Sequence, residues 1–111
     1  MGYYESYTGV DINEEVDDLA FVKNAVLLDV RTPREFAAGH IPGAVNLDYR
    51  EIVPQNAGMI EEALPDKSAP IYSYCRSGAR SGMAVGILKQ MGYMRVTNLG
   101  GIINYDGELE V

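Results

Sequence analysis

Residues 70–81 have the sequence Pro70-Ile71-Tyr72-Ser73-Tyr74-Cys75-Arg76-Ser77-Gly78-Ala79-Arg80-Ser81. The first part is a short apolar run typical of a buried strand, and the residues from 80 to 91 repeat apolar side chains at helical spacing. Cys75 therefore falls between a strand and the N-terminus of a helix. A helix N-terminus and neighbouring guanidinium groups stabilise a thiolate, which is the reactive form of cysteine. The stretch predicts that Cys75 is a nucleophile and that the loop after it binds an anion; the loop residues are Arg76, Ser77, Gly78, Ala79 and Arg80.

Strands and helices alternate on both sides of this stretch. Strands are predicted at residues 7–12, 25–30, 44–47, 71–74 and 95–99, and helices at 14–23, 33–38, 59–64 and 80–91. Asn13 and Thr32 are the predicted N-caps of the first two helices. The alternation predicts an α/β fold with a five-stranded, mainly parallel sheet and helices on both faces. In such sheets the functional site lies at the carboxyl ends of the strands, where Cys75 falls. Gly82 and Gly86 share one face of the last helix, which suggests close packing on the sheet.

The length and composition favour a single globular domain. The chain has 111 residues, 47% of them hydrophobic and 23% charged. We expect a flexible lead-in over residues 1–6 and one domain over residues 7–111. No apolar run approaches the roughly 20 residues of a membrane span, and the start does not resemble a signal peptide. A lone cysteine forms no internal disulfide, so we expect a cytoplasmic protein.

The charge distribution restricts the partners. The formal net charge is −7, and residues 1–20 hold six acids and no base. Such a surface repels nucleic acid and anionic membranes, so neither is an expected partner. Residues 73–83, in contrast, hold two arginines and no acid. The local positive charge around Cys75 points to a small anionic partner.

Three motifs resemble those of rhodanese domains, and they occur in the order of that family. These motifs are Leu28-Asp29-Val30-Arg31 with Glu35-Phe36-Ala37-Ala38-Gly39-His40-Ile41-Pro42-Gly43-Ala44, then Cys75-Arg76-Ser77-Gly78-Ala79-Arg80-Ser81, and finally Leu99-Gly100-Gly101-Ile102. The resemblance implies a sulfurtransferase that carries sulfur as a persulfide on Cys75. It implies an anionic donor such as thiosulfate, a cyanide, thiol or protein acceptor, and neither a cofactor nor a metal. Arg76 and Arg80 would orient the donor, the N–H groups of residues 76–80 would hold the persulfide, and the double glycine would lie beneath the loop. Tyr105 stands where many members have tryptophan.

Other functions remain open at this point. Cysteine phosphatases place an arginine six residues after the nucleophile, where this chain has Ser81. The residues also allow a module that docks on a partner or relays sulfur to it, and a redox-sensing thiol, although no second cysteine is present to resolve a disulfide. His40 is expected to be structural, because one histidine and one distant cysteine do not make a zinc site. Asp29 and Arg31 are expected to form a structural ion pair.

Overall fold

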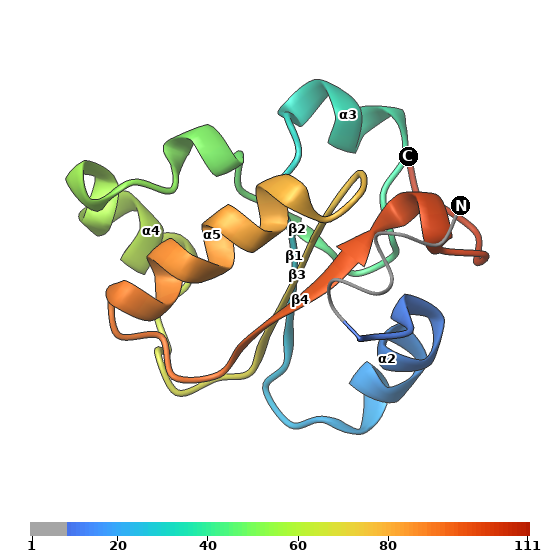
Figure 1. Cartoon of the computed structure of the whole chain (residues 1–111), viewed down its shortest axis with the longest axis horizontal. Coiled ribbons are helices and arrows are strands. Elements are labelled where there is room, and N and C mark those ends of the chain that lie inside the picture. The colour runs from blue at the N-terminus through green and yellow to red at the C-terminus, as the bar shows by residue number, and fades with distance from the viewer. Residues whose placement is uncertain (1–8) are drawn as a thin grey trace.

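The computed structural model describes residues 9–111 and contains a parallel sheet (Figure 1). Four strands form this sheet within the described residues: β1 (Val26–Asp29), β2 (Val45–Asn46), β3 (Ile71–Cys75) and β4 (Val96–Gly101). Their order across the sheet is β2-β1-β3-β4, and all neighbouring pairs are parallel. The two central strands, β1 and β3, are mostly apolar, as expected for strands that are covered on both faces.

The predicted strand at residues 7–12 is wrong where the structure describes it. Residues 9–11 belong to no strand, and Ile12 begins helix α2 (Ile12–Asp18). Residues 7 and 8 of this prediction, and the predicted lead-in over 1–6, lie outside the described residues. The carboxylate of Asp11 caps α2 by accepting a hydrogen bond of 3.0 Å from the backbone N–H of Asn13. Since this cap comes two residues earlier than expected, the segment before it turns into a helix where we expected a strand.

Asn13 therefore does not cap the helix. Its side-chain amide donates to the carbonyl oxygen of Asn104 (2.9 Å), and its side-chain oxygen accepts from the backbone N–H of Asp106 (2.8 Å). These bonds tie the start of the described chain to the segment after β4.

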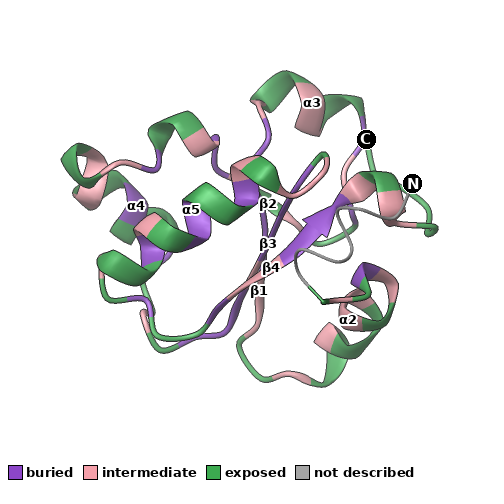
Figure 2. Ribbon diagram, in the orientation of Figure 1, coloured by how far each residue is buried: buried purple, intermediate pink, exposed green. Residues whose placement is uncertain are grey.

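Helices cover both faces of the sheet, as predicted (Figures 1 and 2). Helices α4 (Ala57–Ala63) and α5 (Ala79–Gln90) pack on one face, where Leu28 meets Ile60 and Leu88 in a buried cluster. Helix α2 packs on the other face, in a cluster that includes Ile12 and Leu27. Successive residues of β1 thus point to opposite layers, as the pleat of a strand requires. Short 3-10 turns complete the fold: η1 (Leu19–Phe21), η2 (Tyr49–Glu51), η3 (Pro54–Asn56) and η4 (Ile102–Asn104).

Helix α3 (Pro33–Ala38) follows the carboxyl end of β1 and begins as the sequence predicts. The hydroxyl of Thr32 accepts from the backbone N–H of Glu35 (3.2 Å), and the Glu35 carboxylate accepts from the backbone N–H of Thr32 (3.0 Å). This reciprocal capping box, with Pro33 in the first turn, fixes the start of a helix of only six residues. It also fixes where the Glu35 carboxylate lies, which matters for the site below.

Of the two glycines of α5, Gly82 lies close to β4, since a Cβ atom on it would be 3.4 Å from the side-chain nitrogen of Asn98, whereas Gly86 does not pack as expected. Gly82 and Gly86 are both exposed. A Cβ atom on Gly86 would have no heavy atom within 4 Å, so this glycine does not allow a close approach to the sheet. Larger residues, among them Ala84 and Leu88, face the core instead. Within residues 9–111, no helix combines the length and the apolar character needed to cross a membrane.

Candidate active site

Cys75 is the last residue of β3, at the carboxyl edge of the sheet, and only 1% of it is exposed. The backbone N–H of Gly78 points at its sulfur with an N–Sγ distance of 3.0 Å, and that of Ser81 does so at 3.4 Å. Gly78 is the N-cap of α5 and has a φ of +114°, a conformation that favours glycine. Two N–H donors at a helix N-terminus therefore face the sulfur and favour negative charge there.

Ser81 is a donor that the sequence argument missed, because it lies one residue beyond the predicted loop. Its hydroxyl donates to the hydroxyl of Ser73 at 2.8 Å, and both residues are fully buried. This bond joins the first turn of α5 to strand β3 behind the sulfur. The spacing of six residues between Cys75 and Ser81 was visible in the sequence, but the direction of the N–H group was not.

The double glycine lies beneath the loop, as the resemblance implied. A Cβ atom on Gly101 would overlap the carbonyl oxygen of Arg76 and lie 2.5 Å from the Cα atom of Ser77. A Cβ atom on Gly78 would in turn lie 3.2 Å from the Cα atom of Gly100. The two backbones therefore touch, which leaves no room for side chains between them.

Asn98, in β4, supports the same loop and was not predicted. Its side-chain amide donates to the carbonyl oxygen of Gly78 (3.1 Å), while its side-chain oxygen accepts from the N–H of Gly100 (2.9 Å). A further bond, from the N–H of Ile103 to the carbonyl of Arg76 (3.2 Å), holds the start of the loop. The loop is thus bonded to the segment from 98 to 103 at both of its ends.

The two arginines of the loop have different surroundings. Arg80 donates from Nη1 and Nη2 to the two carboxylate oxygens of Glu35, at 2.6 and 3.1 Å, and lies 5.9 Å from the centre of the Tyr49 ring. The hydrogen bond from Arg80 is the main reason why the pKa of Glu35 is lowered to about 2. Arg76 is exposed, and its side chain has no ion pair or hydrogen bond within the described residues. Arg76 therefore carries the uncompensated charge, while Glu35 neutralises Arg80.

A buried network holds the edge of the site between β1 and α3. Arg31 pairs with Asp29 at 2.7 Å, and the same nitrogen donates to the carbonyl oxygen of Gly39 at 2.7 Å. The hydroxyl of Tyr74 donates to Asp29 (2.7 Å) and accepts from the backbone N–H of Ile41 (3.1 Å). Burial raises the pKa of Tyr74, so the hydroxyl keeps its proton. The expected ion pair between Asp29 and Arg31 is confirmed, and it serves structure.

The sequence of this chain matches a known protein family over most of its length. Residues 13–107 match the family described as "Rhodanese-like domain". The chain belongs to this family. Its three motifs occur within or beside the site described above, from the strand end at Asp29 to the double glycine under the loop.

Several relatives of this rhodanese-like domain are named as sulfurtransferases. "Thiosulfate sulfurtransferase PspE" of Escherichia coli is 39% identical over 75 residues, which cover 68% of this chain and 68% of that protein. A "Sulfurtransferase" of Allochromatium vinosum is 44% identical over 86 residues, covering 77% and 75%. Among solved structures, "rhodanese with anions from E. coli" superposes with a TM-score of 0.68 at 34% identity, covering 78% of this chain and 96% of that one. The chain is a rhodanese-type sulfurtransferase.

His40 of the rhodanese-like domain has structural contacts. The His40 ring stacks on the Phe36 ring with 3.7 Å between ring centres. Nδ1 of His40 lies 2.9 Å from the backbone carbonyl oxygen of Phe36. Its backbone forms an antiparallel bridge with Glu110, whose carboxylate lies 3.4 Å from Nε2. These contacts fasten the C-terminal tail to the turn after α3. Among residues 9–111, histidine, cysteine and acidic side chains form no group of three that could hold a metal ion.

Proposed function

We propose that this sulfurtransferase moves a sulfane sulfur from an anionic donor such as thiosulfate to cyanide or a thiol, through a persulfide on Cys75. The observation that carries the proposal is the pair of backbone donors, Gly78 and Ser81, that point at the sulfur. They stabilise negative charge on the thiolate and afterwards on the persulfide, without the need for a separate base. Gly78 belongs to the candidate substrate-binding loop, together with Arg76, Ser77, Ala79 and Arg80.

The first half-reaction loads the sulfur. The Cys75 thiolate attacks the terminal sulfur of thiosulfate, a new S–S bond forms, and the S–S bond within thiosulfate breaks as sulfite leaves with the electron pair. Because Cys75 is 1% exposed, a slim group such as this terminal sulfur is the kind that reaches it. The outer sulfur of the persulfide then extends about 2 Å beyond Sγ, the length of an S–S bond.

The second half-reaction removes the outer sulfur. Cyanide attacks it, a C–S bond forms, and the S–S bond breaks to leave thiocyanate and the Cys75 thiolate. A thiol reacts in the same way and yields a persulfide. An acceptor cysteine of a partner protein is the alternative, and it would make this chain a sulfur relay with the same loaded intermediate.

The lone reduced thiol leads us to propose that the reaction takes place in the cytoplasm, in one domain spanning residues 7–111. The short loop, with its arginine at Arg80 and Ser81 at the place where cysteine phosphatases have theirs, supports a sulfur atom over a phosphate as the group that is transferred. This preference agrees with the names of two relatives, which describe sulfurtransferases.

The experiment is the intact mass of the protein after incubation with thiosulfate. We expect the wild type to gain one sulfur atom, and cyanide to remove it with the release of thiocyanate. Cys75→Ser should gain none while it keeps the circular dichroism of the wild type. A gain of sulfur by Cys75→Ser would contradict the proposal. A loaded wild type that passes its sulfur to protein thiols and not to cyanide would favour the relay.

A further inference from the structure

Ser81 is bonded to strand β3 at two points. Its backbone N–H points at Sγ of Cys75 (3.4 Å), and its hydroxyl donates to the hydroxyl of Ser73 (2.8 Å). Ser73 and Cys75 are two positions apart in β3, so their side chains leave the strand on the same face, which α5 covers. Ser73 and Ser81 are fully buried, so water does not compete for these contacts. One contact would fix a distance, whereas two contacts also fix the orientation of Ser81 on the strand.

The N–H of Ser81 depends on the sulfur for its hydrogen bond. The first turn of a helix leaves its N–H groups without acceptors inside the helix, and Ser81 lies in the first turn of α5. The direction of this N–H therefore depends on how the first turn sits on the strand. Within the described residues, the bond between Ser73 and Ser81 is the only side-chain to side-chain hydrogen bond that joins α5 to β3.

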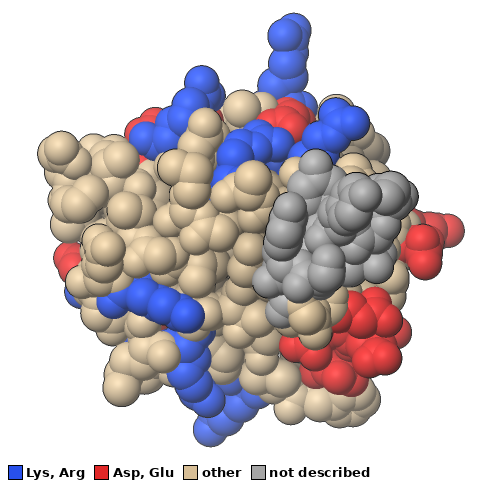
Figure 3. Space-filling view, viewed as in Figure 1, with Lys and Arg blue, Asp and Glu red and all other residues tan. Residues whose placement is uncertain are grey.

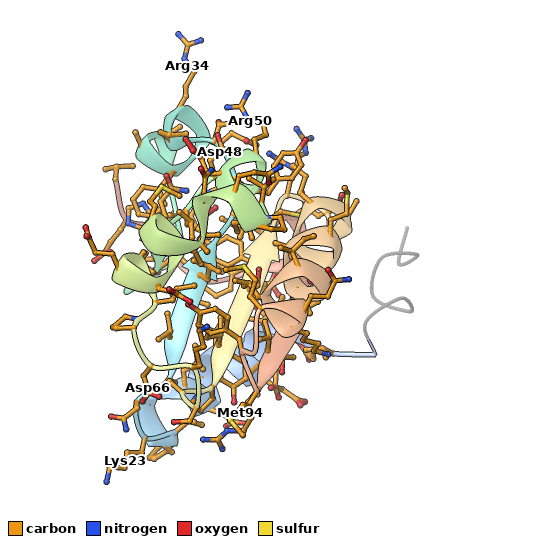
Figure 4. The ribbon with its side chains drawn as sticks, turned by 90° about the vertical axis from the view of Figure 1, so that its left-hand side faces the viewer. Lys23, Arg34, Asp48, Arg50, Asp66 and Met94 are labelled. Atoms are coloured by element: carbon orange, nitrogen blue, oxygen red, sulfur yellow. The ribbon has the colours of Figure 1, made fainter. Side chains whose placement is uncertain are left out.

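The second donor to the sulfur is held in a similar way. Asn98 is the partner of Ser73 in the register of β3 and β4, and its side-chain amide donates to the carbonyl oxygen of Gly78 (3.1 Å). The N–H of Gly78 points at the sulfur from 3.0 Å. Two neighbouring residues of the sheet thus each hold one of the residues that donate to Sγ. Figure 4 shows α5 running alongside the strands, with side chains filling the space between them.

We propose that Ser73 is a positioning residue for sulfur transfer, and that it acts through Ser81 by holding an N–H group against Cys75. A well-directed N–H stabilises the negative charge of the thiolate. When cyanide attacks the outer sulfur of the persulfide, a C–S bond forms, the S–S bond breaks, and its electron pair returns to Sγ, where this N–H stabilises it. For this last step the inference rests on the proposed function.

The charged side chains around the loop act on Cys75 in another way. They are Arg76, Arg80 with its partner Glu35, and the buried pair of Asp29 and Arg31. Figure 3 shows lysine and arginine side chains along the upper edge of the molecule, where they meet solvent. Salt screens such exposed charges, but it affects a buried contact much less. The effect of Ser73 should therefore be independent of salt.

The test is a pH titration of the Cys75 thiolate, followed by its ultraviolet absorbance in the full chain. Cys75 is the only cysteine, and Cys75→Ser supplies the baseline that removes the absorbance of the tyrosines. We expect Ser73→Ala to move the midpoint of the titration to higher pH by about half a unit, since one charge-assisted hydrogen bond is weakened. Unloading of the persulfide by cyanide should slow about twofold, because a less stable thiolate leaves more slowly.

Ser81→Ala and the double variant Ser73→Ala/Ser81→Ala separate positioning from stability. Each single variant changes one of two buried hydroxyls that bond to each other, and it should lower the melting temperature by about 5 °C. The double variant removes both hydroxyls, so its melting temperature should return close to that of the wild type. Its titration midpoint should stay shifted by the same amount as in the single variants, because all three lack the bond between α5 and β3.

Tyr93→Phe is the control for the loss of a buried hydrogen bond away from the sulfur. The Tyr93 hydroxyl donates to the carbonyl oxygen of Leu64 (2.7 Å), and the residue is buried. Tyr93 precedes β4 at the amino edge of the sheet, whereas Cys75 lies at the carboxyl edge. The next residue, Met94, is labelled at the lower end of the molecule in Figure 4. This variant should lose stability and keep the titration midpoint and the unloading rate of the wild type.

The outcomes separate this inference from the proposed function. A Ser73→Ala variant that titrates as the wild type does would overturn the inference. A double variant whose midpoint returns to the wild-type value would also overturn it, because the shift would then come from an unpaired hydroxyl. The same holds for an equal shift in Tyr93→Phe, or for a shift that disappears between about 0.05 and 0.5 M NaCl. A wild type that takes up no sulfur from thiosulfate would instead overturn the proposed function, and the titration would still test the role of Ser73.

Discussion

Arg80 and Glu35, which are 45 positions apart in the sequence, form a bidentate ion pair. This pair joins the loop after Cys75 to the first turn of α3. The guanidinium is planar and offers parallel donors, so it fits a carboxylate in a way that lysine does not. The side chains are 25% and 32% exposed, which places the pair at the rim of the site. The positive charge of Arg80, which we expected to orient the donor, is therefore already neutralised by Glu35.

The ion pair predicts a pH dependence of stability. The pKa of Glu35 is lowered from 4.5 to about 2, first by the hydrogen bond from Arg80. A lowered pKa in the folded state means that the stabilisation is fully present above pH 4.5 and is lost as the pH falls toward 2. Because solvent screens a rim pair, we expect this contribution to be about 1–2 kcal/mol. Urea unfolding at pH 7, 4.5 and 3 measures it, and Glu35→Gln should narrow the difference between pH 7 and pH 3. The exposed Glu62→Gln serves as the control, and an equal change in both variants would contradict the assignment.

The two partners should affect the use of thiosulfate in opposite directions. Arg80→Gln leaves the Glu35 carboxylate uncompensated beside the loop that follows Cys75, so kcat/KM for the dianionic donor should fall about tenfold. Glu35→Gln frees the charge of Arg80 and should keep or raise kcat/KM. The double variant should lie between the two single variants. If both single variants lose activity to the same extent, the pair acts only by holding the loop to α3.

The contact beneath the loop predicts a large difference between two alanine substitutions. Gly101→Ala would push a methyl group into the backbone of Arg76 and Ser77, so we expect a loss of more than about 3 kcal/mol of stability and of sulfur transfer. Gly86→Ala has open space around it in the middle of α5 and should stabilise the protein by about 0.5–1 kcal/mol. Thermal unfolding of the two variants tests this contrast. A tolerated Gly101→Ala would mean that the loop can shift away from β4.

A single buried hydroxyl is predicted to stabilise the edge of the site. Tyr74→Phe leaves the N–H of Ile41 and one oxygen of Asp29 without that partner, which should cost about 1–3 kcal/mol. Tyr72→Phe is the matched control in the same strand, because the Tyr72 hydroxyl has no hydrogen bond among the described residues. Chemical denaturation measures both variants. Equal stabilities would show that water or a rearrangement replaces the lost bonds.

Much of the fold could be predicted from local patterns. The two central strands are short, mostly apolar segments, and the start of α3 is encoded by Thr32, Pro33 and Glu35 within four residues. The segment before α2 was harder, because Asp11 and Asn13 are both good capping residues and only the tertiary contacts of Asn13 decide between them.

From the sequence, Cys75, the loop after it and the double glycine beneath the loop could be named as candidates, but the side chains that hold the loop could not. The roles of Asn98 and Glu35 depend on contacts with residues 20 and 45 positions away, which spacing along the chain does not reveal. Arg80 seemed equivalent to Arg76 in the sequence, and the difference between them arises only when α3 brings Glu35 to the loop. The close packing predicted for Gly86 was wrong because helical spacing gives a shared face but not the direction of that face.

One oxygen of Glu35 accepts hydrogen bonds from the Thr32 backbone, the Thr32 hydroxyl and Arg80 at once. Positions 32, 35 and 80 therefore form one coupled unit for anyone who redesigns this protein. A new residue at position 80, chosen to admit a different donor, will also alter the folding of α3, and a change of Thr32 will alter the loop that holds the sulfur. Libraries that vary these three positions together should yield active variants that stepwise substitution would miss.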